Sequence, residues 1–436
     1  VSVPAQCGLI SSRRMSGERV FARYWIETAL APADAAAIMA GEQSTGTFIK
    51  VPGETEDLRE KHAARIERIV ELDRADRPSL PGAIRPKDAS AGYRRAEIAL
   101  SWPISNMGPS LPNLLATVAG NLFELKPFSG LKLLDVTLSP AFLDRYQGPQ
   151  FGVAGTRAFA GVPEGPLIAT IIKPSVGLTP EATAAMVETL VHGGIDFIKD
   201  DELQADGPHC PFSERLRHVM KVIRNYAERA GRKPMYAFNI TGEIDDMLRR
   251  HHEVVAAGGT CVMVSMNSVG LPALVALRKH AQVAIHGHRN GWGIYDRSPA
   301  IGMTYIAYQK FWRMAGVDHM HVNGLDNKFC EPDESVIASA RECFQPMFPP
   351  PLPGCRIMPV FSSGQTARQA PDTYKALGST DLIFACGGGI MGHPDGIAAG
   401  VRSLRQAWDA AIKGVPLADY AATHSELGAA LRKFAA

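Results

Sequence analysis

Polar and apolar residues alternate along the N-terminal third of the chain, a pattern typical of strands with one exposed face. The stretch Arg19–Thr28 reads Arg-Val-Phe-Ala-Arg-Tyr-Trp-Ile-Glu-Thr, and similar segments follow at 94–101 and 131–138. An alanine-rich stretch at 32–41 predicts a helix after the first of these strands. We therefore expect an α+β domain over residues 16–148.

From residue 149 onward the pattern changes to short, continuously apolar runs separated by helical stretches. Such runs are typical of parallel strands with both faces buried. Eight occur, at Leu167–Ile172, Ile195–Ile198, Met235–Ile240, Cys261–Met266, Val283–Ile285, His319–Val322, Ile357–Phe361 and Leu382–Ala385. Eight strand–helix units in about 280 residues suit a closed (β/α)8 barrel. We predict a barrel catalytic domain over 149–436, and a tail over residues 1–15, which show no periodicity.

Composition narrows the class of protein further. The chain has 436 residues, 46% hydrophobic and 21% charged, as in ordinary globular proteins. The net charge of +2 argues against a surface dedicated to nucleic acid. The seven cysteines include no Cys-x-x-Cys pair, which favours a reducing compartment over a disulfide framework. Because we find neither a signal peptide nor an apolar run of membrane-spanning length, we expect a cytoplasmic protein with no membrane partner.

The second apolar run ends in a cluster of charges, Lys199-Asp200-Asp201-Glu202. In a barrel, the carboxyl ends of the strands carry the chemistry. A lysine beside three acids is often only a salt-bridged, solvated turn. A lysine that has reacted with CO2 is instead an anionic carbamate, and with Asp201 and Glu202 it would supply three hard oxygen donors, which suit Mg²⁺.

Reactive residues follow most of the other predicted strands as well. They are Lys173, His286, His288, Arg289, His319, His321, Gly324, Lys328, Ser362, Ser363, Gly364, Gly387, Gly388 and Gly389. Each of these residues has an ordinary structural explanation when taken alone. We expect the side chain of His321 to face the site, and that of His319, which we interpret as out of phase with it along the strand, to be packed. Glycines after the last strands suit phosphate, because they expose backbone N–H groups. Convergence on one barrel face favours a phosphorylated keto-sugar substrate, and disfavours an open doubly wound sheet.

The run Gly193-Gly194-Ile195-Asp196-Phe197-Ile198, together with the charged cluster that follows, resembles the signature of the large subunit of ribulose-bisphosphate carboxylase/oxygenase (RuBisCO). The likeness begins near Gly17 and is closer to the RuBisCO-like proteins than to the true carboxylases. It implies a TIM barrel behind a ferredoxin-like α+β domain. It also implies Mg²⁺ held by Lys199, Asp201 and Glu202, with CO2 bound as a carbamate on Lys199.

Further segments carry the same resemblance. Ile171-Ile172-Lys173-Pro174 resembles the motif whose lysine serves enolisation and protonation. The segment from Glu42 to Thr47 is similar to a motif that reaches into the site of a partner subunit, and Asn121 matches a substrate contact beside the metal. The resemblance implies Lys173, Lys199, His288 and Lys328 as catalytic residues, and Glu42, Thr47, Asn121, Arg289, His321, Ser362, Gly364, Gly387 and Gly388 as substrate or phosphate contacts. Shared sites imply at least a homodimer, with further assembly left open and no small subunit.

Departures from the true carboxylases decide the subclass. Ser175 stands where they have a second lysine, Phe48 where a tryptophan follows the threonine, and Trp292 where they have a histidine. The sixth loop, Val322–Lys328, also lacks their Ser-Gly-Thr form. These changes alter protonation at Lys173 and the exclusion of water. The resemblance therefore implies retained enolisation and altered carboxylation machinery.

We expect an enzyme that forms an enediolate from a phosphorylated keto-sugar acid, as the decarboxylases and transcarboxylase/hydrolases of 3-oxo-isoapionate 4-phosphate do. Retention of Lys173, Lys199, Arg289 and Lys328 favours such bond making or breaking beside the enediolate. The alternatives are the 2,3-diketo-5-methylthiopentyl-1-phosphate enolase of methionine salvage, to whose pocket Trp292 could contribute, and ribulose-bisphosphate carboxylase itself. A barrel that binds phosphate without catalysis remains a further alternative, against which the retained metal ligands argue.

Overall fold

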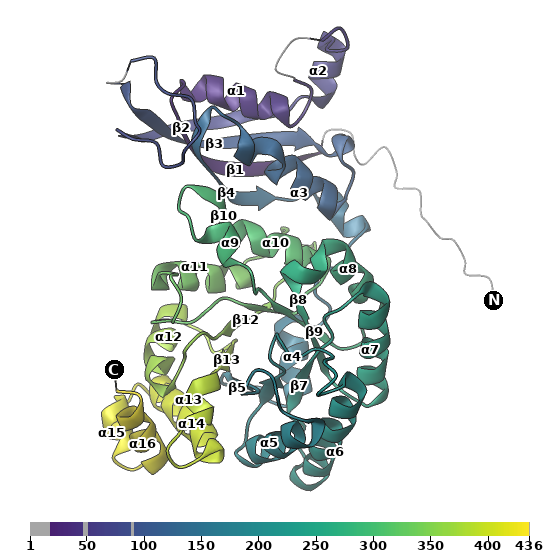
Figure 1. Cartoon of the computed structure of the whole chain (residues 1–436), viewed down its shortest axis with the longest axis vertical. Helices are drawn as coiled ribbons and strands as arrows, with labels where there is room; N and C mark the ends of the chain where they lie inside the picture. The colour runs from purple at the N-terminus through teal and green to yellow at the C-terminus, as the bar shows by residue number, and fades with distance from the viewer. Residues whose placement is uncertain (1–17, 47–50, 89–90, 436) are drawn as a thin grey trace, which may run out of the picture. The chain divides into compact units, whose positions relative to one another are not determined.

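The computed structural model describes residues 18–46, 51–88 and 91–435, which divide between two compact units (Figure 1). The first unit contains the chain up to Gln147 together with 293–311 and 347–352. The second contains 148–292, 312–346 and the chain from Pro353 onward. Among the described residues, no helix has the length and apolar content needed to cross a membrane.

The first unit is built on a five-stranded sheet of order β10-β4-β1-β3-β2. Its strands are β1 (Arg19–Thr28), β2 (Arg65–Ala75), β3 (Tyr93–Pro103), β4 (Phe128–Thr137) and β10 (Ile301–Met303). β1 pairs antiparallel with β3 and β4, and β10 joins the edge of β4 in parallel. Val20, Tyr24 and Ile26 on one face of β1 are buried, whereas Phe21 on the other is exposed, so the alternation in the sequence marks a one-sided sheet.

Helices of the first unit are α1 (Pro32–Glu42), α2 (Glu56–His62), α3 (Leu111–Ala119) and α9 (Gly293–Asp296), and short 3₁₀ turns lie at 104–106, 121–124 and 140–144. The structure confirms the predicted strands β1, β3 and β4 and the helix α1. The pattern did not predict β2 or β10. β2 is an edge strand with its side chains exposed or half-buried on both faces, and β10 is only three residues long, so neither produces a clear alternation.

The second unit is a closed barrel of eight parallel strands. They are β5 (Leu167–Ile171), β6 (Phe197–Lys199), β7 (Met235–Asn239), β8 (Cys261–Ser265), β9 (Ala284–His288), β11 (His319–His321), β12 (Met358–Phe361) and β13 (Ile383–Ala385). Each predicted apolar run therefore contributes one strand, which confirms the TIM barrel.

Helices separate the strands and surround the barrel (Figure 1). They are α4 (Gly152–Ala160), α5 (Pro180–His192), α6 (Phe212–Ala230), α7 (Ile244–Ala256), α8 (Met266–His280), α11 (Asp333–Phe344), α12 (Ala370–Leu377), α13 (Gly387–Met391), α14 (Ile397–Lys413), α15 (Leu417–Ala421) and α16 (Ser425–Lys433), with a 3₁₀ turn at 367–369 before α12. α10 (Tyr305–Ala315) is divided between the two units, the first of which contains its residues 305–311. In α6, Leu216, Val219 and Ile223 recur at helical spacing and are buried.

Alternate strand residues fill the middle of the barrel. This core comprises Leu167, Ala169, Phe197, Met235, Ala237, Cys261, Met263, Ala284, Met358, Val360, Ile383 and Ala385. Because side chains along a strand alternate in direction, the same phase continued to the carboxyl ends also points inward. That phase includes Lys199 at the end of β6 and Asp201 after it, His286 and His288 on β9, and Ser362 after β12. Strand period therefore decides which reactive residues enter the barrel.

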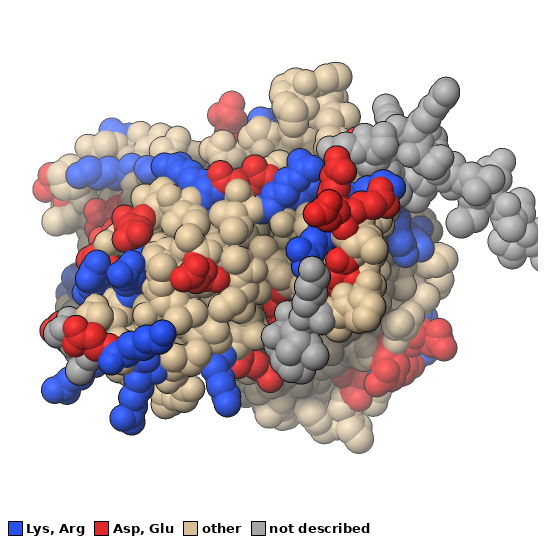
Figure 2. All heavy atoms as spheres, turned by 90° about the horizontal axis from the view of Figure 1, so that it is seen from above, with Lys and Arg blue, Asp and Glu red and all other residues tan. Residues whose placement is uncertain are grey.

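Positively and negatively charged side chains are interspersed on the face shown in Figure 2. This mixture accords with the small net charge of +2. The surface in that view therefore offers no single-sign field of the kind that a polyanion would require.

Candidate active site

Lys199, the last residue of β6, lies inside the barrel with only 1% of its side chain exposed. Its Nζ donates to the carbonyl oxygen of Asp200 at 2.8 Å and lies 3.4 Å from Oε2 of Glu202. Burial lowers the pKa of Lys199, although the neighbouring Glu202 and Asp201 oppose that shift. The structure therefore favours an amine that loses its proton more readily than a surface lysine, as reaction with CO2 requires.

Asp201 points toward the loop that follows β5. Nζ of Lys173 lies 2.5 Å from Oδ2 of Asp201 and donates to Oγ of Ser175 at 2.9 Å. Asp201 is buried, whereas 41% of the Lys173 side chain is exposed. Lys173 thus links the carboxylate to the open end of the barrel. Solvent reaches Lys173 readily, whereas Lys199 is buried.

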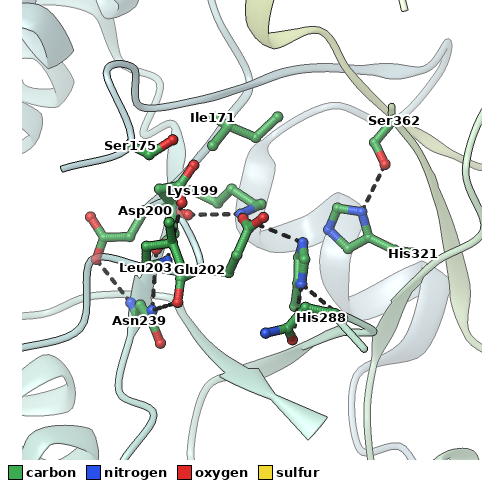
Figure 3. A network of polar contacts seen from close by, with 12 residues as sticks. Ile171, Ser175, Lys199, Asp200, Glu202, Leu203, Asn239, His288, His321 and Ser362 are labelled. Carbon is green, nitrogen blue, oxygen red and sulfur yellow. Dashed lines mark hydrogen bonds and ion pairs between the residues drawn. The ribbon is translucent and has the colours of Figure 1, made fainter. Parts of the chain in front are cut away.

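Glu202 lies between Lys199 and His288, as Figure 3 shows. Its Oε2 is 3.5 Å from Nε2 of His288. Burial opposes ionisation of Glu202, but the neighbouring His288 and Lys199 outweigh it and lower its pKa to about 2. Burial, reinforced by Lys199, lowers the pKa of His288 to about 4, so this imidazole is neutral at pH 7. We call Lys173, Lys199, Asp201 and Glu202 the carboxylate side.

Asp200 has the opposite strand phase and is held outside the barrel interior. Its carboxylate accepts from Nε of Arg215 at 3.2 Å, from the Tyr236 hydroxyl at 2.5 Å and from the backbone N–H of Asn239 at 2.9 Å. Asp200 and Arg215 are both buried. Of the three acids in the cluster, Asp200 is therefore a structural anchor that fixes the end of β6 rather than a candidate ligand.

Asn239, at the end of β7, is a residue that the sequence analysis missed. Its Nδ2 donates to the backbone carbonyls of Asp201 at 3.1 Å and Glu202 at 3.2 Å. It is completely buried. A polar residue at the end of an otherwise apolar strand was the available signal, and it fixes the backbone from which both carboxylates project.

Across the barrel lie His286, His288 and His321, whose rings meet edge to face. Nε2 of His286 is 2.8 Å from Nε2 of His321. Nδ1 of His321 is 2.9 Å from Oγ of Ser362 (Figure 3). We call His286, His288, His321 and Ser362 the histidine side. His319 is packed as predicted, but the reason given was wrong. Residues two apart on a strand point the same way, and His319 contacts His286 inside the barrel, deeper than His321.

Arg289, predicted to contact a phosphate, is buried against Glu331. Its Nη2 lies 2.7 Å from Oε2 of Glu331, and the guanidinium lies 5.7 Å from the centre of the Trp292 ring. Nδ2 of Asn323 also donates to Glu331 at 2.6 Å. Sequence analysis did not identify Glu331. It follows the sixth loop in the chain, and only the fold brings it to Arg289.

The remaining predicted contacts come from the loops after β11, β12 and β13. The backbone N–H of Lys328 donates to the carbonyl of Ser363 at 3.1 Å, which joins the sixth loop to the segment with Ser362 and Gly364. A Cβ on Gly387 would lie 3.9 Å from Cε of Lys173, so the start of α13 is beside that lysine. A Cβ on Gly388 would meet nothing within 4 Å, which leaves its backbone approachable.

Glu42 and Asn121 belong to the first unit. Nδ2 of Asn121 donates to Oε1 of Glu42 at 3.5 Å, so these two predicted substrate contacts are neighbours in the first unit. Thr47 and Phe48 lie outside the described residues.

The donor set on the carboxylate side fits Mg²⁺ only together with a carbamate. Among the described residues there is no group of three histidine, cysteine, aspartate or glutamate side chains arranged to hold a metal. Asp201 and Glu202 supply two hard oxygen ligands, and the buried amine of Lys199, adjacent to Glu202, is where a carbamate would add a third. The residues present therefore match the predicted ligand set.

Both parts of the chain match known protein families. Residues 152–434 match the ribulose bisphosphate carboxylase large chain catalytic domain, and residues 14–142 match its N-terminal domain. The chain is 56% identical, over 95% of its length and 99% of the relative, to a 3-oxo-isoapionate-4-phosphate transcarboxylase/hydrolase of Xanthobacter autotrophicus. It is 43% identical, over 91% and 94%, to a 3-oxo-isoapionate-4-phosphate decarboxylase of Rhizobium rhizogenes.

A crystal structure of a RuBisCO-like protein from Burkholderia fungorum superimposes with a TM-score of 0.88 at 46% identity, covering 95% of this chain and 100% of that one. The matches extend through both units, and these three relatives are named as a transcarboxylase/hydrolase, a decarboxylase and a RuBisCO-like protein rather than as true carboxylases. The chain belongs to the ribulose bisphosphate carboxylase large-chain family, in its RuBisCO-like branch.

Proposed function

We propose that this chain is a transcarboxylase/hydrolase of 3-oxo-isoapionate 4-phosphate. The observation that carries the proposal is the carboxylate side, in which buried Lys199 adjoins Glu202 while Lys173 contacts Asp201 at 2.5 Å. The near full-length identity of 56% to a relative of that name supports the choice of substrate. It favours carboxyl transfer over the other reactions of the family.

Lys199 as a carbamate, Asp201 and Glu202 would hold Mg²⁺. When bound, the ion would stabilise negative charge that develops on the carbonyl and hydroxyl oxygens of the substrate. Asp200, Arg215 and Asn239 contribute by fixing the backbone of this segment, so that the oxygen donors need little rearrangement.

The substrate is a 3-oxo acid, and this determines the first bond change. The bond between the carboxylate and its neighbouring carbon breaks, the carboxylate leaves as CO2, and the electron pair of the bond moves into the enediolate of the remaining fragment. Nζ of Lys173, between Asp201 and Ser175, is the group on this chain positioned to deliver or accept a proton at a substrate carbon. Replacing Asp201 would therefore disturb both the ligand set and the placement of this ammonium group.

The phosphate would bind at the glycine-rich start of α13 and near Arg289. Gly387 lies beside Lys173, so a phosphate at the exposed backbone N–H groups of this segment would place the sugar carbons near the lysine. Arg289 already has Glu331 as a partner, so an anion there would compete with a carboxylate. This makes the α13 segment the stronger phosphate contact of the two.

Decarboxylation is the second candidate, because a relative 43% identical carries that name. Both reactions begin with the same cleavage. They differ in the fate of the enediolate. In decarboxylation the enediolate is protonated, whereas in the transcarboxylase/hydrolase reaction it is carboxylated at its second carbon and then cleaved by water. Closure of the sixth loop over the enediolate, with Lys328 at its end, would favour the second outcome.

Phosphorus NMR of the full chain with Mg²⁺, bicarbonate and 3-oxo-isoapionate 4-phosphate tests the proposal. We expect phosphoglycerate to form, and we expect the variant D201N to form none. A tetrulose phosphate would identify a decarboxylase instead. An unchanged spectrum would contradict both assignments and leave the methionine-salvage enolase, tested with its diketo phosphate, as the next hypothesis.

We also propose that the chain works as a homodimer in which Glu42, Thr47 and Asn121 serve the barrel of the partner. The support is the family resemblance and the contact between Glu42 and Asn121. Mixing inactive E42Q with inactive K199A, after dissociation and reassembly, should restore up to about a quarter of the activity, since each hybrid has one intact site. An active monomer would contradict this arrangement.

A further inference from the structure

Buried histidines connect the candidate site with the opposite end of the barrel. From the site downward, Ser362 contacts His321, His321 contacts His286 and His286 contacts His319. The last contact, between the two Nδ1 atoms of His286 and His319, is 3.4 Å. Nε2 of His319 then lies 2.6 Å from Oγ1 of Thr156 on α4. The chain of polar contacts is continuous, and nothing in the proposed reaction uses its lower half.

The far end of this chain lies at the amino ends of the strands. The backbone N–H groups of Phe151 and Gly152, at the start of α4, donate to the carboxylate of Asp318, the residue before β11. Thr156 is itself completely buried. Phe197 packs against the rings of His286 and His319, so the histidines have apolar surroundings.

All three histidines are neutral at pH 7. Burial lowers the pKa of His319 to about 3 and the pKa values of His286 and His321 well below their usual range. A neutral imidazole has one N–H donor and one bare nitrogen acceptor. Each contact between two rings therefore requires a donor on one ring and an acceptor on the other.

Thr156 fixes the order of donors and acceptors. Its hydroxyl donates to the carbonyl of Gly152, one helical turn earlier, so its oxygen can only accept from Nε2–H of His319. Nδ1 of His319 is then bare and accepts from Nδ1–H of His286. Nε2 of His286 is in turn bare and accepts from Nε2–H of His321.

The chain ends at Ser362. With Nε2 of His321 protonated, its Nδ1 is bare and accepts the hydroxyl proton of Ser362 at 2.9 Å. Ser363 donates its own hydroxyl proton to Oδ1 of Asn323, so its oxygen is the other acceptor within reach of Ser362, but at 3.4 Å it lies farther away than Nδ1 of His321. The hydroxyl of Ser362 thus has its proton directed into the barrel and its lone pairs left for the site.

We propose that Thr156 is a positioning residue that sets the tautomers of His319, His286 and His321 and so makes Ser362 a hydrogen-bond acceptor toward bound substrate. The inference rests on the proposed function only for the identity of that substrate. An acceptor at Ser362 selects a hydroxyl group of the keto-sugar rather than a phosphate oxygen or a carboxylate, which would need a donor. A side chain on α4 thereby affects specificity without contacting the substrate.

The substitution T156V should reverse the chain. It removes the acceptor and would leave the Nε2–H of His319 buried against a methyl group, which is unfavourable. If all three histidines exchange tautomers, every ring-to-ring contact is kept and only a bare nitrogen faces the methyl group. Nδ1 of His321 then donates to Ser362, whose own proton turns toward the site. T156S keeps the acceptor and should behave as the unchanged chain.

Neutron diffraction from deuterated crystals of the full chain at neutral pH tests the assignment without any substrate. We expect deuterium on Nε2 of His319, Nδ1 of His286 and Nε2 of His321, and the opposite pattern in T156V. T373V is the matched control, since Thr373 is also a buried barrel-unit threonine but has no histidine contact among the described hydrogen bonds. Deuterium on Nδ1 of His321 in the unchanged chain would overturn the proposal, and so would a change confined to His319 in T156V.

Kinetics of the same variants test the effect on specificity. We expect T156V to raise KM for the keto-sugar phosphate by about tenfold while kcat changes less, which corresponds to one lost hydrogen bond. T156S and T373V should keep the original KM. An unchanged KM in T156V with reversed tautomers would overturn the role in specificity. The expected diffraction pattern in a protein that fails to turn over this sugar phosphate would support the tautomer assignment and contradict only the proposed function.

Discussion

The two sides of the candidate site are built in opposite ways. The carboxylate side takes three of its four residues from one strand end and is rich in charge. The histidine side gathers its residues from β9, β11 and the end of β12, and its imidazoles are neutral. A local cluster of charge needs strong anchoring to stay inside a barrel, whereas neutral rings can share protons among themselves. The difference suggests that one side stabilises charge while the other orients hydroxyl groups.

The largest expected effect comes from K199A. Removing the amine removes the site of the carbamate, so Mg²⁺-dependent turnover should fall by at least about 10³-fold, as for other losses of a central electrostatic group. Steady-state assays with and without Mg²⁺ and bicarbonate measure it. The control K221A replaces a lysine on the exposed face of α6 and should retain activity. Undiminished turnover in K199A would refute the metal site.

Within the carboxylate side, Asp200 and Asp201 should respond differently. D200N weakens the partner of the fully buried Arg215, so we expect the free energy of unfolding to fall by about 3 kcal/mol. D201N should abolish turnover while changing stability by less than about 1 kcal/mol, because its partner Lys173 is 41% exposed. Urea denaturation and activity assays on both variants measure the contrast. Equal stabilities would contradict the anchoring role of Asp200.

Stability should depend on pH through the histidine side. Because folding lowers the pKa of His319 to about 3, the unfolded chain binds a proton at a pH where the folded barrel does not. The contribution that each neutral, buried histidine makes to the free energy of unfolding is therefore fully present above the unfolded pKa of about 6.5. It decreases as the pH falls toward 3, by up to about 1.4 kcal/mol per pH unit.

Urea denaturation between pH 7.5 and 5 measures this slope. H319Q should reduce it, whereas H192Q, on the exposed surface of α5, should leave it unchanged. A stability that stays constant over this range would contradict neutral burial of the histidines.

The smallest effect is expected at Glu331. E331Q keeps an acceptor for Arg289 and Asn323 but removes the negative charge beside the guanidinium. Inorganic phosphate should then inhibit about 3- to 10-fold more strongly, because it no longer competes with a carboxylate. Inhibition constants at fixed ionic strength measure this, with E334Q on the exposed start of α11 as the control. Weaker inhibition would show that Glu331 instead orients Arg289 for phosphate.

The sequence by itself determined the barrel, its eight strands and the residues at their ends. Continuous apolar runs have few structural alternatives, and strand period then decides which side chains point inward. That rule, applied consistently, also separates Asp201 from Asp200 and aligns His319 with His321.

Only the tertiary structure decided how these residues are paired. Asn239 holds the backbone of Asp201, Glu331 meets Arg289, and Thr156 ends the histidine chain, each across a gap in sequence that no local pattern reports. The physical reason is that strand order and loop closure, rather than composition, fix which buried donors meet which acceptors.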